Sequence, residues 1–345
     1  MKVRLRTADG WESFALDSKR MSVGSCSDEP DLHYLVPGLV DTHCHGASGF
    51  DVMRGESEQI AAALQSVGVE WFLPTTVTAS WADVRAAIDA VTDFTGTAGF
   101  HLEGPYISSD AAGAQPSEHI QPPSFEQLSR ELGDRLEKIK LVTLAPEIDG
   151  ASDLITSLVK VGIKVSVGHS CATYDQLVLA SKLGATRMTH FYNAMSPLHH
   201  RELGCVGFGL VNRPTCELIY DRVHVSRKAA ELLIRSVGVE RIIGISDGTM
   251  FSGPSAPKFS EMWGHQVTVH DGAVRLPSGT LCGSSSTLAD VFSNLWSDFG
   301  PDVATDTCSV NPRRELNLPP ATLWLIVSED GSVQELLSGN LRYQV

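Results

Sequence analysis

The chain has 345 residues, of which 42% are hydrophobic and 20% are charged, and its formal net charge is −14 at pH 7. This composition is typical of a folded globular protein and argues against disorder, while the acidic charge argues against nucleic acid or an anionic membrane as a partner. The first residues lack the apolar stretch of a secretory signal, and no segment approaches the roughly 18 apolar residues of a membrane span. We therefore expect a cytoplasmic protein without membrane contact.

Short β-like runs occur at both ends of the chain. KVRLR lies near the start, and TLWLIV and VQELLS lie near the end. Runs of this length with turn residues between them are typical of antiparallel strands. We expect the segments 1–36 and 318–345 to meet in one small β domain.

Residues 37–317 alternate eight β-rich runs with amphipathic helical stretches. Strands are predicted over 39–43, 69–77, 100–106, 139–146, 163–169, 187–192, 216–223 and 241–247. Helices are predicted over 56–67, 81–94, 124–137, 151–161, 173–183 and 226–237. Strict alternation indicates a parallel sheet with right-handed crossovers. Eight units favour an α/β fold of the (β/α)8 TIM-barrel type, although a doubly wound open sheet has the same alternation.

The first predicted strand ends in the segment PGLVDTHCHG, residues 37–46. Side chains two apart in a strand point to the same side, so His43 and His45 present two imidazoles together, whereas Cys44 points away. The seven cysteines show no CxxC spacing, and we expect them to be reduced. Two imidazoles alone do not make a metal site, because a metal needs three or four ligands.

Further candidate ligands follow at the ends of other predicted strands. Glu103 ends the third strand, His169 the fifth, His190 the sixth and Asp247 the eighth. Each residue alone could cap a turn or bond to a backbone carbonyl. In a parallel barrel, however, the carboxyl ends of all strands meet at one mouth, so these side chains should converge there. The pattern predicts a divalent metal site and favours the barrel over the open sheet.

These residues lie in motifs that resemble the amidohydrolase superfamily, and within it the N-acetylglucosamine-6-phosphate deacetylases. The matching stretches are PGLVDTHCHG, FLPTTVT, HLEGPY, VGHS, THFYNAMSPLHHRELGCVG, ISDG and GTLCGSSST. The resemblance implies that Glu103, His169 and His190 bind the principal ion. It also implies that His43 and His45, with Glu103 bridging, offer a second position, and that Asp247 is the catalytic aspartate.

The resemblance further implies the cofactor, the substrate contacts and the assembly. Zinc is the first expectation for the metal, with iron, manganese or cobalt as alternatives, at one or two ions per subunit. The family is commonly dimeric, so we expect a homodimer in which Arg201 can serve the neighbouring subunit's site. The implied substrate contacts are Asn193, Ala194, Arg201, His224 and the segment Leu281, Cys282 and Gly283.

The sequence departs from the family pattern at two positions near the predicted site. Gln115 stands where the family has a histidine close to the reacting group. Glutamine can donate a hydrogen bond to an oxyanion, but it cannot carry charge or move a proton. Arg222 stands where the family usually has glycine. Its side chain could fill part of the sugar pocket or add a second anion contact.

The function implied is hydrolysis of N-acetylglucosamine 6-phosphate to glucosamine 6-phosphate and acetate, by a metal-activated water with Asp247 as general base and acid. One alternative is an amidohydrolase acting on a different N-acylated amine or on an unphosphorylated amino sugar. The choice between glucosamine and galactosamine stays open at this point. A third interpretation, a metal-binding protein whose site has decayed, is disfavoured because every ligand candidate is present together with Asp247.

Overall fold

The structure is a computed structural model that describes residues 1–7, 10–25, 33–91, 96–253, 255, 259–270 and 272–343. It contains an eight-stranded sheet, a seven-stranded sheet and two smaller sheets. In the part of the chain so described, no helix is both long enough and apolar enough to cross a bilayer. Six cysteines in these ranges are free thiols, and Cys26 lies outside them.

The eight-stranded sheet is the predicted barrel, and its strands neighbour one another in chain order. They are β5 (Leu39–Cys44), β8 (Val69–Thr76), β9 (Phe100–Glu103), β10 (Ile139–Leu144), β11 (Lys164–Val167), β12 (Ala185–Met188), β13 (Thr215–Leu218) and β14 (Ile242–Gly244). Every ladder between them is parallel. The prediction of a (β/α)8 TIM-type barrel is therefore confirmed, and the open sheet is excluded by the closure described next.

The barrel closes between its first and last strands at the carboxyl end. The Asp247 backbone N–H donates to the His43 carbonyl at 3.0 Å, and the His45 N–H donates to the Gly248 carbonyl at 2.8 Å. At the other end, the Ser309 hydroxyl donates to the carbonyls of Pro37 and Gly38. The closing backbone bonds thus involve the predicted site residues themselves.

Several predicted strands extend too far at their carboxyl ends. His169, His190 and Asp247 follow β11, β12 and β14 instead of belonging to them. Their φ angles are 48°, 30° and 47°, in the left-handed region, which is incompatible with a strand. The chain turns away from the ladder at each of these residues, and the turn directs the side chain over the mouth of the barrel.

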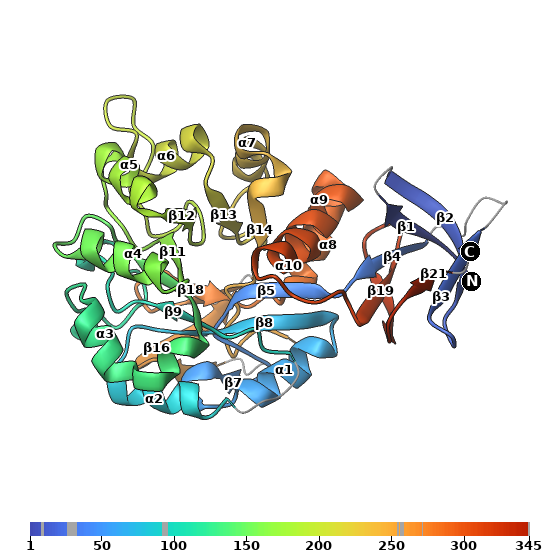
Figure 1. The fold of residues 1–345 in the computed structure, drawn as a ribbon, viewed down its shortest axis with the longest axis horizontal. Coiled ribbons are helices and arrows are strands. Elements are labelled where there is room, and N and C mark those ends of the chain that lie inside the picture. Colours follow the sequence, from blue (N-terminus) through green and yellow to red (C-terminus); the bar gives the residue numbers. More distant parts are fainter. Residues whose placement is uncertain are drawn as a thin grey trace.

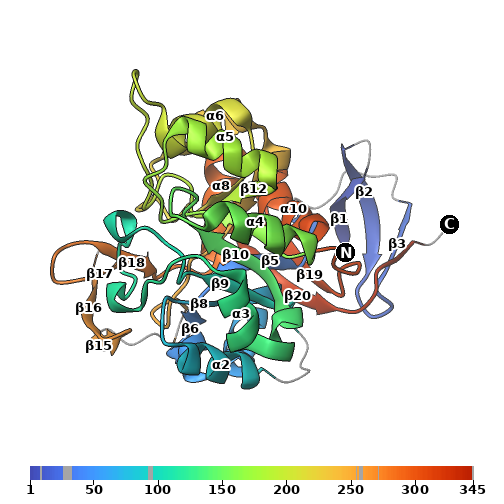
Figure 2. The ribbon, with the colours of Figure 1, turned by 60° about the vertical axis from the view of Figure 1, so that its left-hand side comes forward.

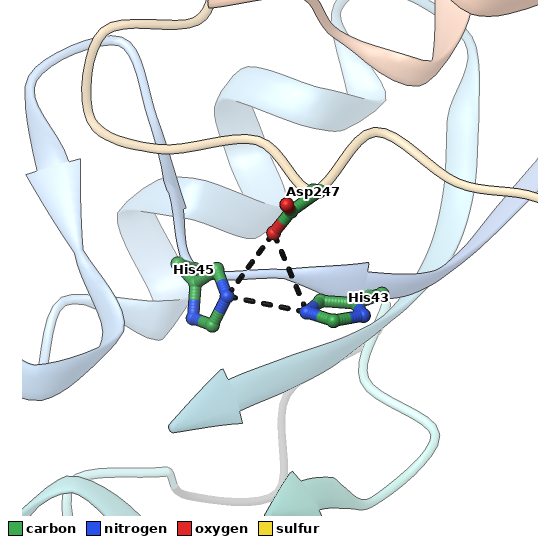
Figure 3. A group of neighbouring side chains, drawn as sticks. All are labelled: His43, His45 and Asp247. Atoms are coloured by element: carbon green, nitrogen blue, oxygen red, sulfur yellow. Dashed lines mark hydrogen bonds and ion pairs between the residues drawn. The ribbon is translucent and has the colours of Figure 1, made fainter. Parts of the chain in front are cut away.

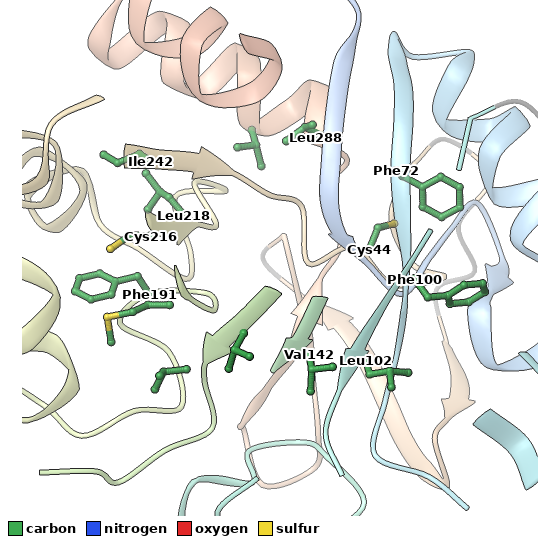
Figure 4. Packing of buried hydrophobic residues seen from close by; sticks show 14 of the residues in the cluster. Cys44, Phe72, Phe100, Leu102, Val142, Phe191, Cys216, Leu218, Ile242 and Leu288 are labelled. Atoms are coloured by element: carbon green, nitrogen blue, oxygen red, sulfur yellow. The ribbon is translucent and has the colours of Figure 1, made fainter. Parts of the chain in front are cut away.

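Six helices correspond to predicted ones: α1 (Ser57–Gln65), α2 (Trp81–Asp89), α3 (Phe125–Leu132), α4 (Ala151–Lys160), α5 (Tyr174–Leu183) and α7 (Arg227–Val237). Four more were not predicted: α6 (Gly204–Asn212), α8 (Leu288–Phe299), α9 (Pro301–Thr305) and α10 (Asn311–Glu315). Five of these ten helices begin at a Ser or Thr whose hydroxyl accepts a backbone N–H, as at Ser80, Ser226 and Thr287. Apolar side chains fill the space between strands and helices, including Phe72, Phe100 and Leu218 (Figure 4).

The termini form the seven-stranded sheet, in the order β20, β19, β4, β1, β2, β3 and β21. These strands are Val333–Ser338, Leu323–Ser328, His33–Pro37, Lys2–Thr7, Gly10–Asp17, Ser22–Ser25 and Arg342–Tyr343, respectively. The sheet lies beside the barrel and carries both ends of the chain (Figure 1). The expected small β domain is therefore present, while the division at residues 36 and 318 stays a prediction.

A four-stranded antiparallel sheet that was not predicted follows the last barrel strand. It consists of β15 (Phe259–Met262), β16 (His265–His270), β17 (Ala273–Arg275) and β18 (Leu281–Ser284). It projects on the side of the barrel away from the terminal sheet (Figure 2). Through Trp263, Leu281 and Gly283 it forms one wall of the site described below.

Candidate active site

Six side chains with metal-binding atoms meet at the carboxyl end of the barrel. They form two groups, His43 with His45 and Asp247 (Figure 3), and Glu103 with His169 and His190. Within each group, one nitrogen or oxygen atom of every residue lies within 4.8 Å of those of the other two. All six residues are buried.

Glu103 lies between the two groups and contacts both. Its Oε1 is 3.1 Å from the Nε2 of His190 and 3.3 Å from the Nε2 of His43. Its Oε2 is 3.3 Å from the Nε2 of His45. Asp247 Oδ1 completes the cluster at 3.4 Å from His43 and 3.2 Å from His45. The geometry matches the expected bridging carboxylate, although the ligand roles themselves stay predictions.

The outer nitrogen of each imidazole is fixed by an oxygen acceptor. The Nδ1 of His45 donates to the Thr75 carbonyl at 3.1 Å. The corresponding bonds are His169 to Ala111 at 2.9 Å, His190 to Asn193 at 3.2 Å and His43 to the Glu217 carboxylate at 3.0 Å. In the neutral imidazoles these bonds place the proton on Nδ1 and leave the Nε2 lone pair facing the centre. Four such lone pairs and two carboxylates form a donor set that suits a divalent ion of the zinc type.

The backbone directly after Glu103 accepts only glycine. Gly104, directly after it, has a φ of 83°, and a Cβ at this position would lie 2.1 Å from the Thr78 hydroxyl oxygen. Only glycine therefore fits between Glu103 and Pro105. Together with the positive φ angles of His169, His190 and Asp247, this places sparsely populated backbone conformations around the site, as is common where function requires a fixed geometry.

The carboxylates and imidazoles shift each other's ionisation. Burial disfavours charge on His45, but hydrogen bonds that the ring donates to Asp247 and Glu103 outweigh it and raise the pKa of His45 to about 9. Burial likewise opposes charge on His43, yet Glu103, Glu217 and Asp247 raise its pKa well above the usual range. The imidazoles in turn overcome burial and hold the pKa values of Glu103 and Asp247 below their usual range. The site is thus built to hold positive charge, either protons or a metal ion.

A buried polar network lies beneath this cluster. Glu217 on β13 contacts His43, and its pKa is held well below the usual range despite burial, mainly by Arg187 and His43. His101 donates or accepts at Thr143 and contacts the His43 ring at a centroid distance of 4.7 Å. None of Glu217, Arg187 and His101 was singled out from the sequence. The detectable signal was a charged residue inside an otherwise apolar strand, as in CELIYD.

A pocket of about 390 Å³ opens onto the two groups. Its wall includes most of the predicted site residues as well as Trp263, which was not predicted. The lining residues predicted from the sequence are His45, Glu103, Gln115, His169, His190, Asn193, Ala194, His224, Asp247, Leu281 and Gly283. His43 lies behind this surface, with no exposed area of its own.

Gln115 is held against Glu103 in a single orientation. Its Oε1 accepts the Thr78 backbone N–H at 2.7 Å, and its Nε2 donates to Glu103 Oε2 at 2.6 Å. Because a backbone N–H only donates and a carboxylate only accepts, both contacts require the same amide orientation. The amide nitrogen carries two hydrogens, so one N–H remains for a group in the pocket.

Three residues that were discussed from the sequence do not reach the pocket with their side chains. Arg201 is exposed on the loop before α6, and its guanidinium contacts His200 at 2.8 Å. Cys282 faces the core around Met250 because side chains alternate along β18, so only its backbone is near the lining residues. Arg222, for which the sequence left open a place in the sugar pocket or a second anion contact, does not line the pocket, and its side chain pairs with Asp298 at 3.0 Å and is 48% exposed.

Comparison with known proteins gives consistent matches over this region. A model of the amidohydrolase family matches residues 34–296. N-acetylglucosamine-6-phosphate deacetylase of Lysinibacillus sphaericus is 35% identical over 274 residues, which cover 76% of this chain and 70% of that protein. N-acetylgalactosamine-6-phosphate deacetylase of Escherichia coli O157:H7 is 33% identical in an alignment 360 positions long, which covers 97% of this chain and 94% of that protein.

Solved structures agree with these relatives. The N-acetylglucosamine-6-phosphate deacetylase of Thermotoga maritima superposes with a TM-score of 0.86 at 31% identity, covering 98% of this chain and 97% of that chain. A mutant of the Mycobacterium smegmatis enzyme, solved in complex with N-acetyl-D-glucosamine-6-phosphate, superposes with a TM-score of 0.83 at 29% identity and covers 95% of this chain and 93% of that chain.

Proposed function

Because this chain belongs to the amidohydrolase family, in the group of N-acetylglucosamine-6-phosphate deacetylases, we propose that it hydrolyses the acetamide of N-acetylglucosamine 6-phosphate to give glucosamine 6-phosphate and acetate. The single observation that carries the proposal is the pair of metal-binding groups joined by Glu103 at the mouth of the pocket. The alternatives of an unphosphorylated sugar and of an N-acylated amine that is not an amino sugar phosphate are not favoured by the relatives.

Different residues of the site have different roles in amide hydrolysis. A divalent ion, when bound by the imidazoles and Glu103, increases the acidity of water and polarises a carbonyl oxygen. The carboxylate of Asp247 accepts a proton from the attacking water and delivers it to the departing amine nitrogen. The remaining N–H of Gln115 donates to the acetyl oxygen as negative charge develops there.

The sugar phosphate requires donors that the pocket supplies only in part. No Lys or Arg is among the residues that line it in the described structure. His224 lines the pocket, and its Nδ1 bonds to the Asp221 carboxylate at 2.6 Å, which fixes the orientation of the ring. We assign the other phosphate contact to Arg201 of a second copy, because this arginine is exposed and lies outside its own pocket.

The same reasoning supports a homodimer that binds zinc and works in the cytoplasm. Histidine and carboxylate donors suit zinc, and the six free cysteines of the described ranges fit a reducing compartment. Light scattering during size exclusion should give twice the chain mass. Mixing Arg201→Ala chains with Asp247→Asn chains should restore part of the activity, since one site of a mixed dimer is then intact.

Acetate release tests the proposal directly. Protein loaded with zinc should hydrolyse N-acetylglucosamine 6-phosphate and should act far more slowly on unphosphorylated N-acetylglucosamine. Equal activity on both sugars would remove the phosphate contacts from the proposal. Absence of activity on both sugars in protein that contains the metal would overturn the proposed substrate.

A second candidate substrate is N-acetylgalactosamine 6-phosphate. It is favoured by one observation, the match over 97% of this chain to the N-acetylgalactosamine-6-phosphate deacetylase of Escherichia coli O157:H7. The two sugars differ only in the configuration at C4, so a competition assay with both in one reaction gives the ratio of kcat/KM values directly. A ratio above one for the galacto sugar would reverse our assignment.

A further inference from the structure

Glu217 lies beneath the metal-binding cluster and contacts both of its halves. It is on β13 and has no exposed surface. Its Oε2 accepts the Nδ1 hydrogen of His43 at 3.0 Å and the backbone N–H of His190 at 2.9 Å. Its Oε1 accepts two hydrogens from Arg187, at 3.1 Å and 2.6 Å. These four bonds use the acceptor positions of the carboxylate.

This contact distinguishes His43 from the other imidazoles of the cluster. His45, His169 and His190 each donate their outer hydrogen to a backbone carbonyl. His43 alone donates to a charged side chain. A carboxylate acceptor makes the opposite nitrogen of the ring a stronger donor to a metal than a carbonyl does.

Arg187 fixes the carboxylate in this position. Its guanidinium is buried and also donates to the Thr42 hydroxyl and to the Glu315 carboxylate of α10. Arginine has donors only, so the oxygen that faces it must be an acceptor. Glu217 therefore cannot rotate its carboxyl group without losing either Arg187 or His43.

We propose that Glu217 is a positioning residue of this deacetylase, which fixes the ring of His43 with its proton on Nδ1 and holds the backbone of His190 at its φ of 30°. The inference rests on the proposed function, because it takes His43 and His190 as metal ligands. Glu217 touches neither the ion nor the substrate and acts only through these two residues.

The variant Glu217→Gln makes the inference testable, since glutamine keeps the shape of the side chain. Its oxygen must face Arg187, which leaves the amide NH2 facing the Nδ1 of His43 and the N–H of His190. His43 can accept this hydrogen only if its own proton moves to Nε2. The proton then points at the metal position, and His43 is lost as a ligand.

We would titrate Zn²⁺ against a chromophoric chelator and record the histidine tautomers of the zinc-loaded protein by ¹⁵N NMR. Glu217→Gln should bind zinc about 10- to 100-fold more weakly than the wild type, and the His43 proton should move from Nδ1 to Nε2. The matched control is Glu70→Gln. Glu70 is also buried and paired with an arginine, Arg313, at 2.6 Å, but it lies at the far end of β8 from the site. This control should keep wild-type zinc affinity.

The outcomes separate the inference from the proposed function. A wild-type protein that binds no zinc would remove the proposed function. If the wild type binds zinc and Glu217→Gln binds it equally well, or if both variants lose affinity to the same degree, the inference is overturned alone. If Glu217→Gln does not fold, the ¹⁵N NMR spectrum of the zinc-loaded wild type tests the inference instead. A His43 ring that carries its proton on Nδ1 supports the inference, and one that carries it on Nε2 overturns it.

Discussion

Asp247 has two possible uses in the site, because its Oδ1 is within 3.4 Å of both His43 and His45. The same oxygen could hold a metal ion or accept a proton. Its lowered pKa keeps it ionised at neutral pH, which both uses require. A substitution that preserves shape but removes proton acceptance distinguishes them.

We expect Asp247→Asn to retain zinc and substrate but to lose about 10²- to 10⁴-fold in kcat, because an amide cannot accept the proton of water. Zinc content, substrate Kd and kcat of the variant give the three quantities. A variant with normal kcat would show that another group transfers the proton.

Gln115 gives a second prediction at the level of one residue. Gln115→Leu removes the N–H donor next to Glu103, so kcat should fall about 10²- to 10³-fold, as for other oxyanion donors. Gln121→Leu is the control, since Gln121 bonds to Trp81 and Gln127 and does not line the pocket. Equal losses in the two variants would mean that the effect arises from folding.

At this scale the sequence predicted which residue types converge but not how they are fixed. The strand pattern is sufficient to bring His43, Glu103 and Asp247 to one edge. The acceptors that set the tautomers are carbonyls and side chains from other segments, such as Ala111 and Glu217. Their positions depend on loop conformation and on strand register, which a single sequence does not specify.

At the scale of elements, all eight barrel strands were predicted, because parallel strands buried on both faces give continuous apolar runs. The helix α8 was missed although its start carries a capping box from Thr287 to Asp290. The sheet of β15 to β18 was missed for another reason. Its strands are three to six residues long and mix polar with apolar side chains, so they resemble loops.

The hairpin of β15 and β16 carries Trp263 into the pocket. The indole contacts the His45 ring at a centroid distance of 5.0 Å, and its Nε1 donates to Asp51 at 3.2 Å. We expect the ring to limit the length of the acyl group. Trp263→Ala should raise kcat/KM for the N-butyryl substrate relative to the N-acetyl one by at least about tenfold, the value of one or two methylene groups in an apolar pocket.

Trp263→Phe separates the ring from its hydrogen bond. It keeps an aromatic wall but loses the bond to Asp51, so its acyl preference should stay close to that of the wild type. If both variants prefer acetyl as strongly as the wild type does, Trp263 does not define the acyl site.

At the scale of the whole molecule, the metal-binding groups join strands from opposite parts of the chain. An ion held by residues at the ends of β5 and β9 and directly after β11 and β12 binds only the folded barrel, so it stabilises the fold. At a free zinc concentration about 1,000 times Kd the gain is about 4 kcal/mol. For a chain of this size that raises Tm on the order of 10 °C.

The stabilisation of the fold by zinc should increase as the pH rises. The raised pKa of His45 means that its protonated form stabilises the metal-free fold fully below about pH 6.5, and that this contribution is lost as the pH rises towards about 9. Zinc must displace that proton, so the zinc-induced rise in Tm should grow from pH 6.5 to pH 9. Calorimetry at both pH values, with zinc and with a chelator, measures it. A gain that shrinks over this range would contradict the protonation assigned to the site.

The terminal sheet was also foreseen, but its attachment to the barrel was not. Tyr34 of β4 packs between Trp11 and Trp296, at centroid distances of 5.0 Å and 4.9 Å. Glu70 of β8 accepts the backbone N–H groups of Thr322 and Leu323. The contacts of Tyr34 with Trp296 and of Glu70 with Thr322 and Leu323 join residues more than 200 positions apart, and no local pattern in a sequence reports such pairs.

The seam of the barrel has a consequence for how the protein becomes active. The first and last strands are joined at the mouth by backbone bonds of His43, His45 and Asp247, residues to which we also assign the chemistry. If this seam is open, His43, His45 and Asp247 are not brought together. Closure of the barrel and assembly of the active site are therefore the same structural event.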